Sequence, residues 1–163
     1  MKKIYIAGFD VFYPDAAKRG TKMKMTCAEH GFIGLYPLDN EADTAEEIFR
    51  GNCALIDQAD IVIANMNPFR GAEPDSGTAF EVGYACAKGK KVILYMDDLR
   101  SMREKLGETD EAGFAVENFG LPVNLMLACA ATVVEGDFTA AVKRAKADAF
   151  AESFQPHAGI TAL

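Results

Sequence analysis

The chain has 163 residues, half of them hydrophobic, and a formal net charge of −7 at pH 7. This length fits one domain over residues 1–163, built around a core of ordinary size. The 17 basic residues form no cluster and no apolar run is long enough to cross a membrane, so we expect neither a nucleic-acid nor a membrane partner. The four cysteines are widely spaced, without a C-x-x-C pair, which favours reduced, buried thiols and a cytoplasmic enzyme.

Short apolar runs alternate with helical patterns along the chain. Strands are predicted over residues 4–8, 32–36, 60–65, 91–95 and 132–134, and helices over residues 14–31, 43–59, 77–88, 124–130 and 137–154. Residues 97–122 are predicted to be less regular, and residues 155–163 to form a frayed end. Nearly continuous apolar strands that alternate with helices indicate a parallel sheet covered on both faces. The expected fold class is therefore α/β: a doubly wound (Rossmann/flavodoxin-like) five-stranded parallel sheet with helices on both faces.

In doubly wound folds, ligands bind beyond the carboxyl ends of the strands. The loops after the first four predicted strands are the candidates, at residues 9–14, 37–40, 67–75 and 96–98. The first loop lacks the G-x-G-x-x-G of a dinucleotide site and instead carries three aromatic residues, Phe9, Phe12 and Tyr13. Such rings suit a flat base or the face of a sugar, although they would equally serve to pack the loop against the sheet.

Metal and serine-nucleophile chemistry find little support in the sequence. His30 and His157 lie far apart and have no cysteine or carboxylate at ligand spacing. No G-x-S-x-G motif is present, and Ser76 has no obvious histidine partner. We therefore expect no metal and no cofactor.

The most informative segment is residues 75–85, in which Asp75 and Glu81 flank a Gly-Thr step. A purely structural explanation is that Thr78 and Glu81 form a capping box, or that Asp75 or Ser76 is a plain N-cap. A catalytic explanation is that both acids face the crevice above the sheet. The breaker-rich loop before the segment is longer than a simple strand-helix joint needs, and Gly77 leaves room for a ligand, which favours catalysis.

These residues carry a resemblance to a known family. The chain resembles the nucleoside 2-deoxyribosyltransferases over about residues 3–135, through segments 3–8, 37–40, 59–64, 75–85 and 121–127. Residues 68–75 and 102–105 are most similar to a branch of kinetoplastid parasites and some bacteria. The segment at residues 75–85 is the most specific part of the match.

The resemblance implies a role for each of several residues. Glu81 would be the nucleophile, Asp75 the acid that protonates or hydrogen-bonds the leaving base, and Tyr5 the residue that orients the glutamate. Substrate binding would involve Phe12, Asp39, Asn52, Arg70, Gly77, Asn124 and Met126, the last two reaching into a neighbouring subunit's site. Many relatives carry an aspartate at the position of Asn52, and because an amide both donates and accepts, this chain's base preference would differ.

The activity implied by the resemblance is transfer of 2-deoxyribose between nucleobases through a covalent deoxyribosyl-glutamate, with hydrolysis if water attacks instead. Its partners would be deoxynucleosides and free nucleobases, and the protein would be a homo-oligomer. One alternative is a nucleoside 5′-monophosphate N-glycosidase, in which Arg70 would bind the phosphate against repulsion from Asp10 and Asp15. A further alternative is a non-catalytic nucleotide-binding module of the same fold.

Overall fold

A computed structural model of the protein describes residues 1–153, so the predicted frayed end lies outside the described part of the chain. Five parallel strands form one sheet in the order β2-β1-β3-β4-β5. The strands are β1 Lys3–Ala7, β2 Ile33–Leu35, β3 Ile61–Asn65, β4 Lys91–Met96 and β5 Thr132–Glu135. This confirms the predicted parallel sheet and all five of its strands.

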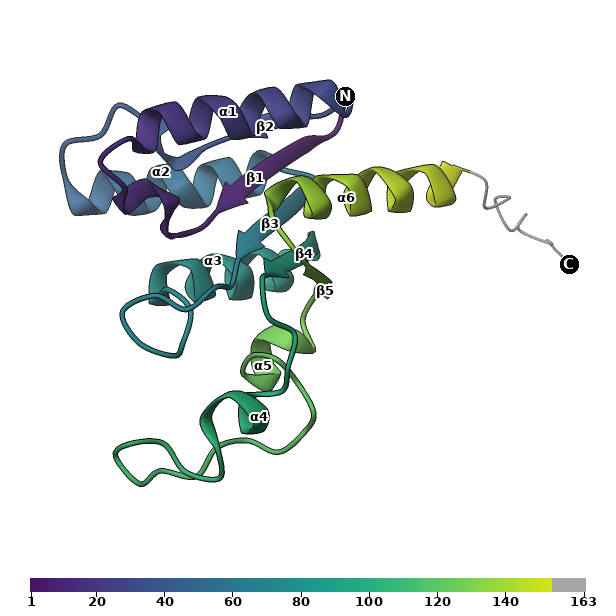
Figure 1. Ribbon diagram of the computed structural model, residues 1–163. Coiled ribbons are helices and arrows are strands. Elements are labelled where there is room, and N and C mark those ends of the chain that lie inside the picture. The colour runs from purple at the N-terminus through teal and green to yellow at the C-terminus, as the bar shows by residue number, and fades with distance from the viewer. Residues whose placement is uncertain (154–163) are drawn as a thin grey trace, which may run out of the picture.

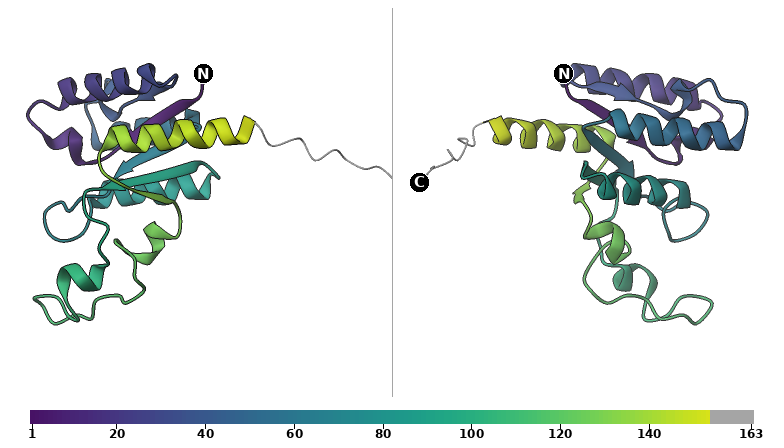
Figure 2. Two further views of the ribbon diagram at one scale, coloured as in Figure 1. Left: turned by 45° about the vertical axis from the view of Figure 1, so that its right-hand side comes forward. Right: turned by 180° about the vertical axis from the view of Figure 1, so that it is seen from behind.

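Helices cover both faces of the sheet, as expected (Figures 1 and 2). The α-helices are α1 Ala16–Glu29, α2 Ala45–Gln58, α3 Ser76–Ala87, α4 Met102–Leu106, α5 Leu125–Ala128 and α6 Phe138–Ser153, and two short 3-10 helices are η1 Phe9–Phe12 and η2 Pro37–Asp39. Helices α1 and α6 pack on one face, and α2, α3 and α5 pack on the other. Residues 97–124, which include α4, extend away from the sheet in Figure 1.

Alternation along β1 decides which side chains reach each layer. Ile4 and Ile6 join the core under α1 and α6, whereas Tyr5 and Ala7 join the core under α2 and α3. All four residues are buried. The aromatic ring of Tyr5 is therefore directed toward the α2 and α3 layer by the register of a central strand.

Some local predictions need correction. Helix α4 was not predicted. Ser101 and Glu104 form a capping box at its start, and their S-x-x-E spacing is a sequence signal for a helix start. The two 3-10 helices were also not predicted. All four cysteines are free, but Cys86 and Cys129 are exposed rather than buried, because each falls on the outer side of its segment. Within residues 1–153, the helices include none with the length and hydrophobicity needed to span a bilayer.

Two helical glycines give a matched test of packing. A Cβ at Gly20 in α1 would overlap the ring of Tyr36, which is buried, whereas a Cβ at Gly83 in α3 would meet nothing within 4 Å. We expect Gly20→Ala to lower the free energy of unfolding by about 2 kcal/mol through overpacking. Gly83→Ala should raise it by roughly 0.5–1 kcal/mol through helix propensity. Urea denaturation of both variants checks this, and equal effects of the two substitutions would contradict the packing argument.

Candidate active site

A cavity of about 370 Å³ lies at the carboxyl ends of β1 and β2, between η1, η2, α2 and α3. Its walls are formed by Gly8, Val11, Phe12, Pro37, Leu38, Asn40, Ala42, Ile48, Asn52, Asp75, Gly77, Thr78 and Glu81. The position agrees with the general rule for ligand sites in doubly wound sheets. Most of the walls are apolar, while the acids and amides are contributed mainly by α2 and the start of α3, so the cavity suits a flat ring with a polar group at one end.

Glu81, in the second turn of α3, is held by side chains from two other elements. Its Oε1 atom accepts a hydrogen bond of 2.6 Å from the Tyr5 hydroxyl on β1. The same oxygen accepts a longer one, of 3.4 Å, from Asn52 Nδ2 on α2. Tyr5, the residue expected to orient the glutamate, therefore contacts it, and Asn52 lies beside it.

Burial dominates the electrostatics of Glu81. It raises the pKa of this carboxyl to about 7, and the nearby charge of Asp75 adds to the rise, while the hydrogen bonds from Tyr5 and Asn52 oppose it. Burial and the charge of Glu81 raise the pKa of Tyr5 above its usual range. Tyr5 therefore stays protonated and remains a hydrogen-bond donor, while Glu81 exchanges its proton near neutral pH.

Asp75 is the N-cap of α3. Its Oδ2 atom accepts hydrogen bonds from the backbone N–H of Thr78 at 2.8 Å and from the Thr78 hydroxyl at 2.9 Å. The N-cap explanation of Asp75 is confirmed, but the capping box between Thr78 and Glu81 is wrong, because Glu81 turns inward to Tyr5 and Asn52. Asp75 Oδ1 accepts no hydrogen bond from residues 1–153, and the side chain lines the cavity.

Some of the remaining expected binding residues line the cavity and others do not. Phe12, Asn52 and Gly77 line the cavity with the two acids. Arg70 lies next to it, with its guanidinium 5.2 Å from the Phe12 ring centre and 4.7 Å from that of Phe69. The rings of Phe12 and Phe69 also stack at 5.2 Å, so Phe12 both packs the loop and faces the cavity.

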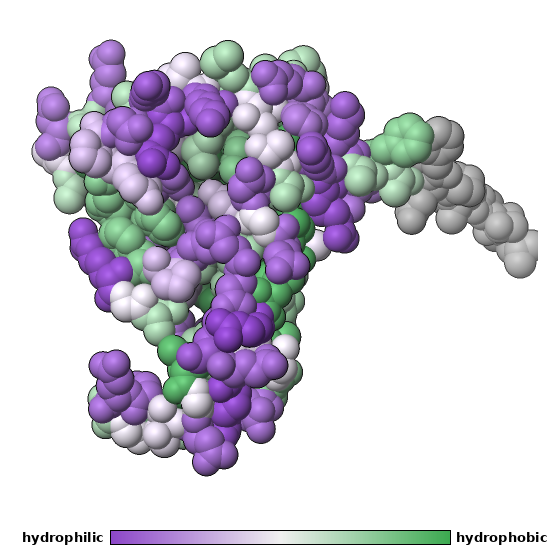
Figure 3. Space-filling model, viewed as in Figure 1, coloured by the Kyte–Doolittle hydropathy of each residue, from purple (hydrophilic) through white to green (hydrophobic). Residues whose placement is uncertain are grey.

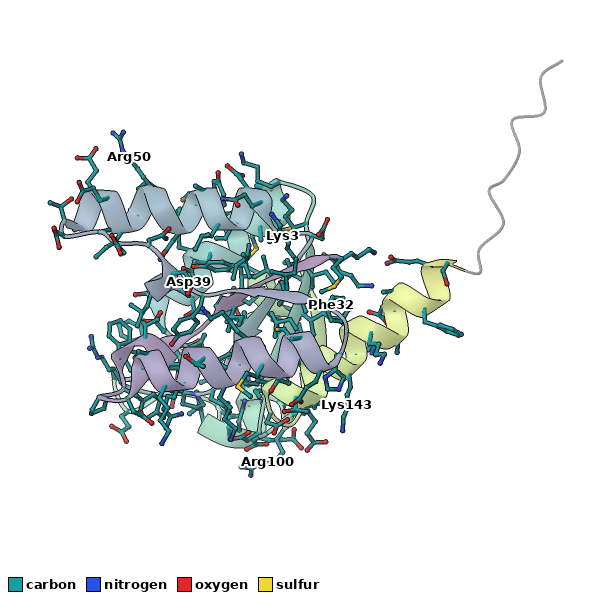
Figure 4. The ribbon with its side chains drawn as sticks, turned by 90° about the horizontal axis from the view of Figure 1, so that it is seen from above. Lys3, Phe32, Asp39, Arg50, Arg100 and Lys143 are labelled. Atoms are coloured by element: carbon teal, nitrogen blue, oxygen red, sulfur yellow. The ribbon has the colours of Figure 1, made fainter. Side chains whose placement is uncertain are left out.

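Asp39 is not among the residues that line the cavity. It lies on η2 between α1 and α2 (Figure 4), where it is ion-paired with Lys24 at 2.5 Å and accepts a hydrogen bond from the backbone N–H of Tyr36. These contacts make it a structural residue of the loop. Its neighbour Asn40 lines the cavity instead.

Asn124 and Met126 do not line this chain's own cavity. Asn124 caps α5 through the backbone N–H of Met126 and donates a 2.6 Å hydrogen bond to Glu117. The side chain of Met126 is 73% exposed. In Figure 3 the surface is hollowed on the left between the body of the molecule and the extension below, with hydrophobic residues at its edges. Met126 is thus available for contact with another molecule, whereas the Asn124 side chain is partly buried and hydrogen-bonded within its own chain.

Sequence reasoning missed several residues of the cavity, chiefly Asn40 and Thr78. Asn40 follows the second predicted strand, within a loop already marked as a candidate, and that position was the available signal. Its side chain rests against Gly51, where a Cβ would lie within 2.7 Å of Asn40 Nδ2. Asn40 Nδ2 and Asn52 Oδ1 are both buried and have no hydrogen-bond partner among residues 1–153, which makes them uncommon polar atoms in a mostly apolar wall.

No group of three or more potential metal ligands occurs among residues 1–153. His30 lies at the end of α1, where its Nδ1 atom is 2.9 Å from the carbonyl oxygen of Thr26.

A partly buried carboxylate beside a second acid, above a parallel α/β sheet, is an arrangement suited to chemistry on glycosidic bonds. The family model for nucleoside 2-deoxyribosyltransferase matches residues 4–126, and the chain belongs to this family. The solved 2-desoxiribosyltransferase from Leishmania mexicana is 39% identical, with a TM-score of 0.80 over 95% of this chain and 100% of that chain. The suspected family resemblance is thus confirmed.

More distant relatives extend the comparison. A CMP N-glycosidase from Clostridium botulinum has the same fold, with 19% identity and a TM-score of 0.54 over 90% of this chain and 99% of that chain. An uncharacterized protein of Schizosaccharomyces pombe is 34% identical over 113 residues, which are 63% of this chain. The match spans about half, 54%, of that curated relative's length.

The raised pKa of Glu81 makes a prediction about stability. A carboxyl with a folded-state pKa of about 7, above its usual value of 4.5, binds its proton more tightly in the folded state. The folded state therefore loses stability as pH rises from about 5 to 7, by roughly 1–3 kcal/mol. Glu81→Gln should recover this stability at pH 8 and change little at pH 5, as measured by thermal denaturation. The exposed Glu29→Gln variant is the control, and an effect of Glu81→Gln independent of pH would contradict the argument.

Proposed function

We propose that this protein transfers 2-deoxyribose between nucleobases of deoxynucleosides through a covalent deoxyribosyl-Glu81 intermediate. The observation that carries the proposal is the partly buried Glu81 carboxylate, hydrogen-bonded to Tyr5 at 2.6 Å and facing the same cavity as Asp75. Its substrates are deoxynucleosides and free nucleobases, and its role is nucleoside salvage in the cytoplasm. Family membership and the likeness to the Leishmania mexicana enzyme support this reaction class.

The first half-reaction breaks the C–N glycosidic bond. Ionised Glu81 attacks the anomeric carbon, a C–O ester bond forms, and the electron pair of the C–N bond leaves with the base. Asp75 donates a proton or a hydrogen bond to that base, because an anionic base is a poor leaving group. Two hydrogen bonds from Thr78 fix one oxygen of Asp75 and leave the other available for the base.

The second half-reaction reverses the first with a new partner. An incoming base attacks the anomeric carbon, the ester bond breaks, and Asp75 accepts the proton that this base loses. Two inversions retain the configuration of the sugar. Attack by water on the same ester would instead give hydrolysis and free deoxyribose.

A second copy of the chain would complete the site. Met126 is exposed at the start of α5, the partly buried Asn124 caps this helix, and neither residue lines its own chain's cavity. We propose that they contact substrate in a neighbouring subunit of a homo-oligomer. Mixing a Glu81→Ala chain with an Asn124→Ala chain tests this arrangement, since hetero-oligomers would regain activity that neither variant has alone.

Loss of the nucleophile gives the direct test of mechanism. Glu81→Ala should abolish base exchange, by at least about 10³-fold, while circular dichroism shows an intact fold. The assay incubates deoxyinosine or deoxythymidine with and without adenine and separates the products, which distinguishes transfer from hydrolysis. Mass spectrometry of the wild-type protein with deoxyinosine alone should detect the deoxyribosyl adduct. Binding without adduct or turnover would favour the non-catalytic module.

The Tyr5 hydrogen bond predicts a shift in pH dependence. Because this bond favours the ionised form of Glu81, Tyr5→Phe should raise the pKa of Glu81 further. The rising limb of kcat/KM against pH, expected to be centred near pH 7 in the wild type, should then move to higher pH. Tyr84→Phe is the matched control, since the Tyr84 hydroxyl bonds Asp57 at the surface. If the rising limb of kcat/KM lies at the same pH in Tyr5→Phe as in the wild type, its assignment to Glu81 is wrong.

A second candidate is a 2′-deoxynucleoside 5′-monophosphate N-glycosidase. The specific observation in its favour is Arg70, a cation that lies over Phe12 at the side of the cavity. Asp10, expected to repel phosphate, does not line this cavity and is bonded to Asn65 and paired with Arg19. Hydrolysis rates of deoxynucleosides and of their monophosphates separate the two functions. Arg70→Ala should reduce only the activity on monophosphates if this candidate is right.

A further inference from the structure

Phe12 is the aromatic wall of the large cavity, and its ring lies outside the buried core. Within residues 1–153, it is the one aromatic side chain in the lining of that cavity. It stands at the end of η1 and is 56% exposed. A flat base stacks well only on a ring whose orientation is fixed, so base binding depends on whatever holds this exposed ring in place.

The backbone of η1 is fixed by contacts that do not involve the Phe12 ring. Asp10, within η1, is buried, and its Oδ2 atom accepts a hydrogen bond of 3.1 Å from Asn65 at the end of β3. Its Oδ1 atom lies 3.5 Å from the Arg19 guanidinium. These contacts hold the chain two residues before Phe12, and the orientation of the Phe12 ring has to be set by other side chains.

Phe69, in the loop after β3, stacks with two rings of η1. Its ring centre is 5.2 Å from that of Phe12 at an interplanar angle of 14°, and 5.1 Å from that of Phe9 at 13°. Such pairs are favourable beyond the area that they bury. Phe9 and Phe69 are both partly buried, so Phe69 connects the exposed Phe12 ring to better-buried side chains.

The loop that carries Phe69 has a defined conformation. Asn67 Oδ1 accepts a hydrogen bond of 2.9 Å from the backbone N–H of Asp97, and the backbone N–H of Phe69 donates one of 2.9 Å to the carbonyl oxygen of Glu73. Arg70 is the one non-glycine residue within residues 1–153 that has a left-handed backbone, with φ 55°. A chain keeps such a conformation only where the surrounding contacts require it. Phe69 is therefore presented to η1 by a fixed loop.

We propose that Phe69 is a positioning residue, which orients the Phe12 ring against the base of the substrate. The proposal rests on the proposed function. Phe69 does not line the large cavity, so it acts on the base through Phe12. Without the Phe69 ring, Phe12 is free to change rotamer, which weakens base binding. Glu81 and Asp75 stay in place, so the bond-breaking step is preserved.

The test is a double-mutant cycle on Phe12→Leu and Phe69→Leu, with deoxyadenosine as donor and hypoxanthine as acceptor. Phe69→Leu should raise the KM of the acceptor about threefold to tenfold, the range for one lost aromatic pair. It should change kcat less than about twofold, since binding rather than chemistry is affected. In the Phe12→Leu background the same substitution should change KM less than about twofold. Phe69→Tyr, which keeps the ring, should restore the wild-type KM.

Phe32→Leu is the matched control for a general loss of stability. Phe32 is a buried ring of the core under α1 (Figure 4). It directly precedes β2, whereas the cavity lies beyond the carboxyl end of that strand. Phe32→Leu should therefore lower the midpoint of thermal denaturation and leave the acceptor KM unchanged.

The outcomes separate this proposal from the proposed function. A raised acceptor KM in Phe69→Leu, absent from Phe32→Leu and from the Phe12→Leu background, supports it. An unchanged KM, or an equal rise with and without Phe12, overturns it, and continued exchange by the wild type leaves the proposed function intact. Absence of exchange by the wild type overturns the proposed function and this proposal with it.

A fluorescence measurement decides the matter if Phe69→Leu does not fold. The chain contains no tryptophan, so Phe69→Trp keeps an aromatic ring and supplies a single fluorophore. In a Glu81→Gln background, which cannot form the ester, deoxyadenosine should change the emission of this tryptophan when Phe12 is present and leave it unchanged in Phe12→Leu. Equal changes in the two proteins, or none in either, overturn the proposal.

Discussion

The hydrogen bond from Tyr5 to Glu81 joins strand β1 to the second turn of α3, and it fixes the position of a carboxylate that lines the cavity. Tyr5 cannot move, because it is fully buried in a central strand whose register fixes its direction. A carboxylate removed from water needs such a fixed donor, since burial without a partner is costly. The same burial that destabilises the ionised form brings the pKa of Glu81 to about 7. Burial of Glu81 therefore lowers the stability of the folded state at neutral pH and yields a carboxyl that titrates in the neutral range.

Asp75 caps a helix and still presents an oxygen to the cavity. Capping consumes Oδ2, which receives both hydrogen bonds from Thr78, while Oδ1 accepts none within the described residues. The cap also stiffens the carboxylate, so less conformational freedom is lost when a ligand binds. Local spacing presents the helix cap and the catalytic acid as alternatives. Because the cap uses only one of the two carboxylate oxygens, it is compatible with the proposed catalytic role.

The sequence predicts the sheet well because its strands are nearly continuous apolar runs, a strong local signal for buried parallel strands. It also predicts the acids, since residues 75–85 carry both. What it does not supply are contacts between distant segments. Tyr5 and Glu81 are 76 positions apart in the sequence. The residue pattern around either one does not predict that they are in contact, and only the family resemblance suggested it. The contact of Asn40 with Gly51 depends on how η2 and α2 meet, which no local pattern encodes.

Under the proposed function, the choice between transfer and hydrolysis depends on how strongly the cavity favours a base over water. A millimolar base competes with roughly a 10⁴-fold to 10⁵-fold excess of water, an advantage of about 6 kcal/mol. Burying about 100 Å² of a base against Val11, Leu38 and Ile48 recovers roughly 2.5 kcal/mol. The remainder has to come from orientation by Asp75 and Asn52 and from keeping water away from the ester. One chain leaves Phe12 and Leu38 more than half exposed, so closure by a second copy and transfer rather than hydrolysis would be consequences of the same contact.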